Sequence, residues 1–341
     1  MMINRSQEEI TSCWETREDL PLVSIRCTVY NHDKYLEDCL NGFLIQKTTF
    51  PFEVFIHDDA STDSSASIIR KYVSKYPKIF KPFYEKENQY SKNDGSFRKI
   101  TWNPNYLQGK YIAICEGDDY WTDPHKLQMQ VDFLETNPNY SMCFHSAEIK
   151  FEGNLYTQAE CKNVQDRDYT AGELLDHWVI PTASIVMRRE CILFPLKKTS
   201  AIITGDMFTV FSCLSIGKIK GFSNPMSVYR VNQGSITYNS EYKKRNIFKR
   251  PENWECFKEN FPFAPKHQVN KYLAFHYWQR ASYQPTLRLS LQDRKKAIAA
   301  SPLVSFLMIF RPMVIATTVF LSKFFDGEKI RAIVRKVTTK V

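Results

Sequence analysis

The segment Glu116-Gly117-Asp118-Asp119 places three carboxylates within four residues. Carboxylates this close together repel one another unless a cation or hydrogen-bond donors offset their charge. Mg²⁺ and Mn²⁺ take oxygen ligands, and proteins often hold them with one or two carboxylates together with substrate phosphates. The spacing therefore favours a divalent-metal site for a phosphate-bearing ligand. The alternative interpretation is a solvated acidic turn.

Two further acidic positions are candidates for the same site. The pair Asp58-Asp59 could accept hydrogen bonds from a nucleobase or a ribose, or it could belong to the capping region of a helix that follows Ser61 and Asp63. Asp206 opens an apolar helical pattern, so it could be a general base or the cap of that helix. Spacing alone leaves both alternatives open.

Strand-like and helix-like segments alternate in the first half of the chain, which predicts a doubly wound α/β sheet. Ligands bind such sheets beyond the carboxyl ends of the strands, where the first loop and the acidic clusters at 58–59 and 116–119 fall. We therefore expect these segments to meet at one edge. The patterns predict strands at 22–29, 53–57, 111–115 and 140–147, and helices at 34–46, at 64–75 and after Pro124.

The second half of the chain has weaker patterns. They predict strands at 181–188, 218–222 and 226–230, a loop entering a helix over 202–217, and a helix at 267–283.

Positive charge is concentrated at the C-terminus. The net charge is +9, and 11 of the 46 Lys and Arg residues but only three of the 37 Asp and Glu residues lie from Thr286 onward. The rest of the chain is nearly neutral, which disfavours a nucleic-acid-binding protein because such proteins carry a basic domain face.

Cysteine and histidine spacing argues against other metal sites. The nine cysteines include no C-x-x-C pair, and the seven histidines show no ligand-like spacing, so we expect the histidines to be packing or surface residues. Residues 1–19 lack the apolar core of a signal peptide. These features predict a reduced, cytoplasmic setting.

Three motifs in this order resemble those of family 2 glycosyltransferases, and the resemblance covers about residues 21–234. The first strand and its loop are Leu22-Val-Ser-Ile-Arg-Cys-Thr-Val-Tyr-Asn31. The second motif is Phe55-Ile-His-Asp-Asp-Ala-Ser-Thr-Asp63, and the third is Gly109-Lys-Tyr-Ile-Ala-Ile-Cys-Glu-Gly-Asp-Asp-Tyr-Trp121. The resemblance implies a GT-A fold, that is, a mixed sheet with flanking helices, here with a C-terminal helical appendage.

The resemblance also implies an activity. It indicates a metal-dependent, inverting transferase of the hexosyltransferase type that uses a nucleotide-diphosphate donor such as a UDP-sugar, Mn²⁺ or Mg²⁺, and a glycan or lipid-linked glycan acceptor. Bacterial surface-polysaccharide synthesis is the implied setting. By position, the nucleotide pocket would include Thr28, Tyr30, Asp59 and Asp118, the metal ligand would be Asp119, and the general base Asp206. Independently of the resemblance, Trp121 could stack on a sugar ring or pack in the core.

One position departs from the family pattern. Many relatives carry a histidine after the motif that is Val228-Tyr-Arg230 here, where this chain has Asn232. Asparagine offers a neutral oxygen ligand but no imidazole, so the metal preference is open.

Two other functions fit parts of the sequence. A nucleotidyltransferase of related fold would need a glycine-rich phosphate loop after the first strand, but residues 30–33 contain no glycine. A noncatalytic module that binds sugars or lipid surfaces would not need Asp206.

The C-terminal segment 302–325 is apolar but is interrupted by Arg311-Pro312. A charge in the middle of a spanning helix costs about 3 kcal/mol or more, so an interfacial or re-entrant helix pair is favoured over a span. The alternative is a helical hairpin on the catalytic domain or a dimer contact. We expect an N-terminal extension (1–20), a GT-A domain (21–240), a helical extension (241–300) and a tail (301–341) at the inner face of the cytoplasmic membrane.

Overall fold

The computed structural model describes residues 5–15, 20–152, 164–232 and 240–309. The chain forms two compact units, which divide between Tyr238 and Asn239. The first unit contains one eight-stranded sheet with the strand order β3-β2-β1-β4-β7-β6-β8-β5.

One half of the sheet is parallel. Strand β1 lies between β2 and β4, and β3 extends the sheet beyond β2. Every residue of β1 is buried, as expected for a strand covered on both faces. This half is the doubly wound part predicted from the sequence. Its strands are β1 (Val23–Val29), β2 (Phe52–Asp58), β3 (Phe80–Tyr84) and β4 (Tyr111–Ile114).

The other half is mixed. Strand β7 runs antiparallel to both β4 and β6, the long strands β6 and β8 are parallel to each other, and β5 pairs antiparallel with β8. The sheet is therefore the mixed sheet of the predicted fold class. Its strands are β5 (Tyr120–Trp121), β6 (Tyr140–Phe151), β7 (Val186–Arg188) and β8 (Lys218–Val231).

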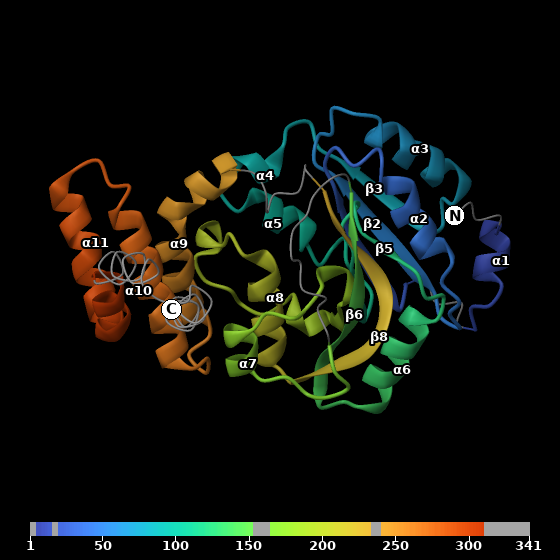
Figure 1. Ribbon diagram of the computed structural model, residues 1–341. Helices are drawn as coiled ribbons and strands as arrows, with labels where there is room; N and C mark the ends of the chain where they lie inside the picture. The colour runs from blue at the N-terminus through green and yellow to red at the C-terminus, as the bar shows by residue number, and fades with distance from the viewer. Residues whose placement is uncertain (1–4, 16–19, 153–163, 233–239, 310–341) are drawn as a thin grey trace, which may run out of the picture. The chain divides into compact units, whose positions relative to one another are not determined.

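Helices cover both faces of this sheet, with α2, α3 and α6 on one side and α7 and α8 on the other (Figure 1). Helix α2 buries Leu36, Leu40, Phe43 and Leu44, which recur at helical spacing. The helices are α1 (Gln7–Thr11), α2 (Leu36–Leu44), α3 (Ser65–Lys75), α4 (Gln89–Lys92), α5 (Ser96–Thr101), α6 (Lys126–Thr136), α7 (Ala171–Asp176) and α8 (Gly205–Leu214).

Two sequence predictions differ from the structure. The segments 218–222 and 226–230 form one strand, β8, because register shifts against β6 place Pro225 opposite Ser146 without ending the pairing. In the segment 181–188, only Val186–Arg188 is a strand, and Thr182–Ser184 forms a 3₁₀ turn.

Within the described residues, the second unit contains three long helices, α9 (Ser240–Asn260), α10 (Lys266–Ala281) and α11 (Leu287–Ala300). A further helical segment follows over 302–309. Helix α10 confirms the helix predicted at 267–283. Most of the predicted tail, residues 310–341, lies outside the described residues.

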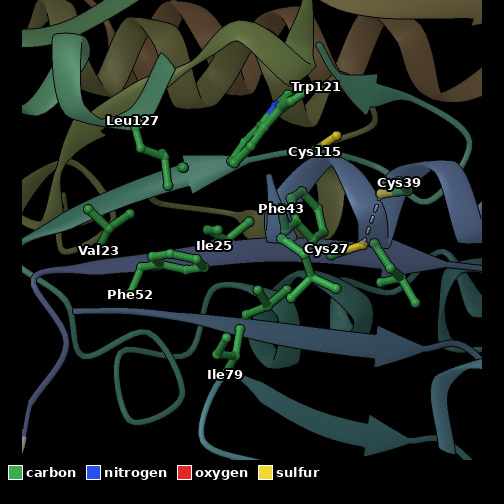
Figure 2. Packing of buried hydrophobic residues seen from close by; sticks show 14 of the residues in the cluster. Val23, Ile25, Cys27, Cys39, Phe43, Phe52, Ile79, Cys115, Trp121 and Leu127 are labelled. Carbon is green, nitrogen blue, oxygen red and sulfur yellow. Dashed lines mark hydrogen bonds between the residues drawn. The ribbon is translucent and has the colours of Figure 1, made fainter. Parts of the chain in front are cut away.

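The core of the first unit lies between the parallel strands and helices α2 and α6 (Figure 2). Trp121 is central to it: the ring packs edge-on against Phe43, and its indole N–H donates to the Ala183 carbonyl at 2.7 Å. The cysteines of the described ranges carry free thiols, with the Cys27 and Cys39 sulfurs 3.9 Å apart.

Helix α2 approaches β5 closely at Gly42. A Cβ atom added there would lie 2.8 Å from the Trp121 backbone nitrogen and 2.9 Å from its carbonyl oxygen. We expect Gly42→Ala to lower the free energy of unfolding by about 1–3 kcal/mol, because backbone atoms on both elements must shift. Urea unfolding followed by circular dichroism measures this change.

Gly205→Ala in α8 is the matched control, since the nearest heavy atom to its added Cβ is the Arg98 Nη1 at 3.8 Å. Alanine is favoured over glycine in a helix by about 1 kcal/mol, so this variant should be as stable as the parent or more stable. Equal stability of the Gly42 variant and the control would contradict the close approach of α2 to β5.

Candidate functional site

The carboxyl ends of β1, β2 and β4 meet at one edge of the sheet. The Gly117 N–H donates to the Thr28 carbonyl at 2.9 Å, which joins the acidic loop after β4 to the end of β1. The Asp59 N–H donates to the Val29 carbonyl at 2.9 Å, which joins the loop after β2 to the same end. The segments expected to converge therefore do so.

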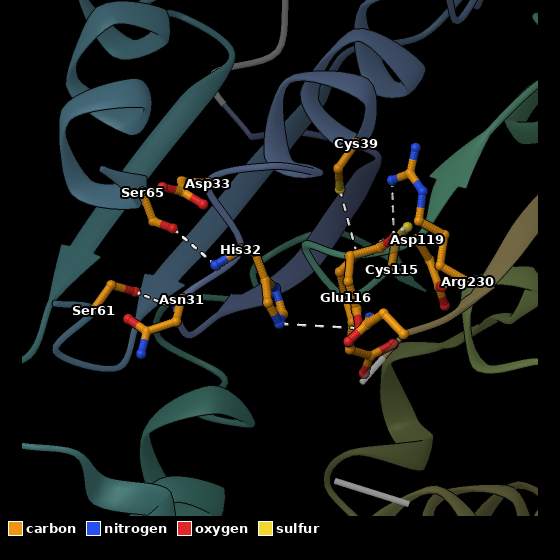
Figure 3. A network of polar contacts seen from close by, with 12 residues as sticks. Asn31, His32, Asp33, Cys39, Ser61, Ser65, Cys115, Glu116, Asp119 and Arg230 are labelled. Carbon is orange, nitrogen blue, oxygen red and sulfur yellow. Dashed lines mark hydrogen bonds and ion pairs between the residues drawn. The ribbon is translucent and has the colours of Figure 1, made fainter. Parts of the chain in front are cut away.

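The loop after β1 is held against the loop after β2 by hydrogen bonds (Figure 3). Asn31 adopts a left-handed backbone with φ 56°, its N–H donates to the Ser61 hydroxyl at 3.0 Å, and its side-chain oxygen accepts from the Thr62 N–H at 2.8 Å. The His32 N–H donates to the Ser65 hydroxyl at 2.9 Å. These bonds hold the backbone of the loop that carries His32.

His32 reaches the acidic loop, which the sequence interpretation missed. Its Nε2 lies 4.0 Å from the Asp118 carboxylate. A Cβ added at Gly117 would lie 2.9 Å from the His32 Nδ1, so only glycine leaves room for the ring at that position. The signal that could have found His32 was its place in the loop directly after the first strand.

Asp119 is buried rather than presented to a ligand. The residue is 3% exposed, and its Oδ1 accepts a hydrogen bond from the Arg230 backbone N–H at 2.8 Å. Burial raises the pKa of the Asp119 carboxyl, the neighbouring Asp118 charge raises it further, and the Arg230 N–H opposes the rise. The contact joins the acidic loop to strand β8.

The Arg230 side chain makes a second connection from β8 to the same loop. Its guanidinium donates to the Asp118 carbonyl at 3.1 Å and to the Glu152 carboxylate at 3.2 Å, and it forms an ion pair with Asp38. The guanidinium also lies 4.5 Å from the centre of the Tyr120 ring. Arg230 is buried and so holds the backbone of the acidic loop in one position.

The Asp118 side chain is more accessible, at 20% exposed. Its Oδ2 accepts from the Asn232 side-chain amide at 3.4 Å. Asn232 follows β8 directly and is buried. The structure therefore brings Asn232, Asp118 and His32 together.

Glu116 lies against a buried cation. The Arg26 guanidinium is 3.6 Å from the Glu116 carboxylate and 4.5 Å from the centre of the Trp102 ring, and its Nε donates to the Thr101 carbonyl. Burial raises the pKa of Glu116 to about 7; Arg26 opposes the rise, and the charges of Asp118 and Asp206 add to it.

The effect of the Asp206 charge on the pKa of Glu116 relates Asp206 to the acidic loop. Asp206 lies in the first turn of α8, is exposed, and is close enough for its charge to raise the pKa of Glu116. Thr204, the residue before the helix, makes no side-chain capping bond. Asp206 and Glu116 are therefore within electrostatic reach of each other, although they are 90 positions apart in the sequence.

The other residues that were predicted to contact the nucleotide differ in how exposed they are. Thr28 is buried at the end of β1, and Tyr30 is exposed beyond it. Asp59 is 1% exposed, and its two oxygens accept from the Gln89 and Tyr90 backbone N–H groups at 2.7 and 3.0 Å. The Asp59 carboxylate thus holds the first turn of α4 and is not presented to a nucleobase.

Trp121 does not fit the predicted sugar contact. Its side chain is 1% exposed, packs on Phe43 and has the Lys126 ammonium 4.0 Å from its ring centre. No face of the indole is left for a sugar ring, so the structure favours the core-packing alternative for Trp121.

The donor set suits a hard divalent cation. Within the described residues, no three His, Cys, Asp or Glu side chains are grouped so as to hold a metal ion by themselves. Mg²⁺ and Mn²⁺ sites often use one or two carboxylates, with phosphate oxygens and water completing the shell. The accessible Asp118 carboxylate, among carboxylates whose pKa values are raised by burial and repulsion, fits that kind of site.

Solved structures resemble this chain in fold. Staphylococcus aureus TarS residues 1–349 in complex with UDP aligns with a TM-score of 0.56 at 19% identity, covering 82% of this chain and 81% of TarS. The mannosyltransferase PcManGT from Pyrobaculum calidifontis, in complex with GDP-Man and Mn²⁺, aligns with a TM-score of 0.51 at 16% identity, covering 98% and 91% of the two chains.

Sequence comparison gives the family. An uncharacterized protein of Mycobacterium tuberculosis is 33% identical over 226 residues, which span 66% of this chain and 63% of that relative. The family model described as "Glycosyl transferase family 2" matches residues 24–192, which contain β1, β2, β4 and the acidic loop. Residues 24–192 therefore form a glycosyltransferase family 2 domain, and the fold agrees with the GT-A fold of the structural neighbours.

Proposed function

We propose that this protein transfers a sugar from a nucleoside-diphosphate donor to an acceptor hydroxyl, with inversion at the anomeric carbon. The observation that supports the proposal is the electrostatic effect of the exposed Asp206 on Glu116, which belongs to the acidic loop at the carboxyl ends of the strands. An acidic loop that holds a diphosphate and a separate carboxylate that accepts a proton are the two parts that single-displacement transfer needs.

The donor class is proposed from the fold neighbours. TarS is in complex with UDP, a nucleoside diphosphate, and PcManGT is in complex with GDP-Man, a nucleoside-diphosphate sugar. We propose a UDP-sugar as the donor. Testing a panel of UDP- and GDP-sugars for release of the nucleoside diphosphate would identify it.

We propose a divalent metal, Mn²⁺ or Mg²⁺, as cofactor, with Asp118 as its protein ligand in place of Asp119. Asp118 is the more exposed carboxylate, whereas Asp119 is buried and bonded to the Arg230 backbone. Asn232, whose side-chain N–H donates to Asp118, is a candidate second ligand through its amide oxygen. The cation would offset the negative charge that grows on the leaving diphosphate.

The proposed role of Asp206 is general base. Its carboxylate would accept the proton of the acceptor hydroxyl while that oxygen attacks the anomeric carbon and the bond to the diphosphate breaks. An aspartate of pKa about 4 is a weak base, so proton transfer must accompany attack. A nucleotidyltransferase is the second candidate, but residues 30–33 supply no glycine-rich phosphate loop.

The biological setting is also a proposal. We propose an acceptor that is a glycan or a lipid-linked glycan in bacterial surface-polysaccharide synthesis, at the inner face of the cytoplasmic membrane. Within the described part of the chain, no helix combines the length and apolar character needed to cross a bilayer. Residues 310–341, which carry most of the predicted membrane-associating tail, lie outside the described residues.

Replacing the proposed base should abolish transfer without abolishing donor binding. We expect Asp206→Asn to lower kcat by about 10²–10⁴-fold, the range for loss of a general base, and to leave donor affinity within about threefold. Product formation and calorimetric binding of UDP with Mn²⁺ measure the two effects. Asp132→Asn, an exposed aspartate on α6, is the control. Unchanged turnover in the Asp206 variant would refute the assignment.

The two adjacent aspartates should respond differently. Asp118→Asn should raise the Mn²⁺ concentration needed for half-maximal activity by about tenfold or more with little loss of stability, because an exposed metal ligand is weakened. Asp119→Asn should mainly lower the unfolding midpoint, because its carboxylate is a buried hydrogen-bond acceptor. Manganese titration of activity and thermal unfolding separate these outcomes, and the reverse pattern would restore Asp119 as the ligand.

Arg230 should act as a positioning residue. Arg230→Lys keeps the positive charge but removes the guanidinium, whose separate nitrogens donate to the Asp118 carbonyl and to Glu152. We expect kcat to fall by about 10–100-fold, since displacements of about 1 Å carry such losses. Arg167→Lys, in an exposed ion pair with Glu173, is the control. Wild-type kcat in the Arg230 variant would show that the loop does not depend on this contact.

A further inference from the structure

The second unit presents one apolar and basic surface on α11 and the residues that follow it. Helix α11 packs on α10, and Ala297 is buried. The Asp293 carboxylate is also buried, and it forms an ion pair with Arg280 of α10 at 2.8 Å (Figure 1 shows the two helices). These contacts determine which face of α11 points outward.

The outward face of α11 carries large apolar side chains. Leu287 is 76% exposed, and Leu291 and Ile298 are about half exposed. At 100° per residue, these three positions fall within about 40° of one another around the helix axis. The helical turns over 302–309 continue the apolar character, with Leu303 71% exposed and Phe306 also exposed. Contiguous exposed apolar surface of this kind marks an interaction site.

Basic side chains flank the apolar stripe. Arg288, Arg294 and Lys295 are all exposed, and at 100° per residue they lie within about 80° of the centre of the stripe. The Arg294 guanidinium lies 5.0 Å from the centre of the Trp278 ring of α10, so this cation is held beside the apolar face. Asp293 is the one acidic residue between positions 287 and 309, and it is buried in the ion pair with Arg280. The exposed face of residues 287–309 therefore carries only positive charge.

We propose that this α11 surface binds the anionic headgroup region of a lipid bilayer, with Leu287, Leu291 and Ile298 inserted among the acyl chains. A helix with a narrow apolar face and basic flanks lies in the plane of such an interface, where the lysine and arginine side chains meet lipid phosphates. A second copy of the chain fits this surface less well, because a symmetric contact would bring the same three cations face to face. A neutral protein partner would leave the cations unused.

This inference does not depend on sugar transfer. Asp206→Asn lies in the first unit and should bind vesicles as the parent does, even if the proposed function is wrong. Membrane binding and catalysis can therefore fail separately.

Vesicle flotation of the full-length chain tests the surface. The parent should partition to vesicles of phosphatidylglycerol and phosphatidylcholine, and much less to phosphatidylcholine alone. The double variant Arg288→Gln with Lys295→Gln should weaken partition to the anionic vesicles by about 25-fold, since each basic residue near such a surface contributes about fivefold. The triple variant Leu287→Gln, Leu291→Gln and Ile298→Gln should lower partition below detection, because insertion is lost.

The matched control changes exposed residues of the same types in the first unit. Leu193→Gln with Lys71→Gln should leave partition unchanged, and circular dichroism should show all variants folded. Two results would overturn the proposal. The first is equal partition of both α11 variants and the parent. The second is a parent dimer, seen by light scattering, that the α11 variants convert to monomer while vesicle binding stays the same.

Discussion

The geometry of the acidic loop depends on one buried cation, the guanidinium of Arg230. Residues 116–119 carry three carboxylates that repel one another, and their positions are fixed from β8 by the Arg230 backbone N–H on Asp119 and by its guanidinium on the Asp118 carbonyl. Because Arg230 itself is buried between Tyr35 and Tyr120 and is paired with Asp38 and Glu152, it has few alternative positions. A strand late in the chain thus determines how the early loop presents Asp118.

The remaining negative charge is only partly offset. Arg26 lies beside Glu116, yet burial and the charges of Asp118 and Asp206 still raise the pKa of Glu116 to about 7. A cation that enters this site reduces the repulsion among its carboxylates. A diphosphate can then approach a loop that would otherwise repel it. The same excess explains why the buried Asp119 and the accessible Asp118 should have different roles, although they are adjacent in sequence.

The two units carry different kinds of functional side chains. The first has carboxylates at the edge of a mixed sheet, and the second has a basic, apolar helix face on α11 whose one acid, Asp293, is neutralised by Arg280. A transferase that acts on lipid-linked acceptors would benefit from both features, since a surface that binds anionic lipid keeps the enzyme where such acceptors reside. Each feature rests on contacts within its own unit.

The sequence determined the strands β1, β2 and β4 of the parallel half, and it determined α2, whose apolar residues recur at helical spacing. It did not predict the edge strand β3, where apolar and exposed polar positions are mixed. It also determined the family, because the motifs around Asn31, Asp59 and Asp118 are local in the chain. The sequence did not reveal that β8 is one strand through Pro225, because the pairing with β6 that accommodates it is long-range. Only the tertiary structure showed that Asp118 is accessible while Asp119 is buried, and that Trp121 lies in the core. It also brought His32, Arg26 and Arg230 to the acidic loop. Burial and charge pairing arise from residues far apart in the chain, and no local pattern encodes them.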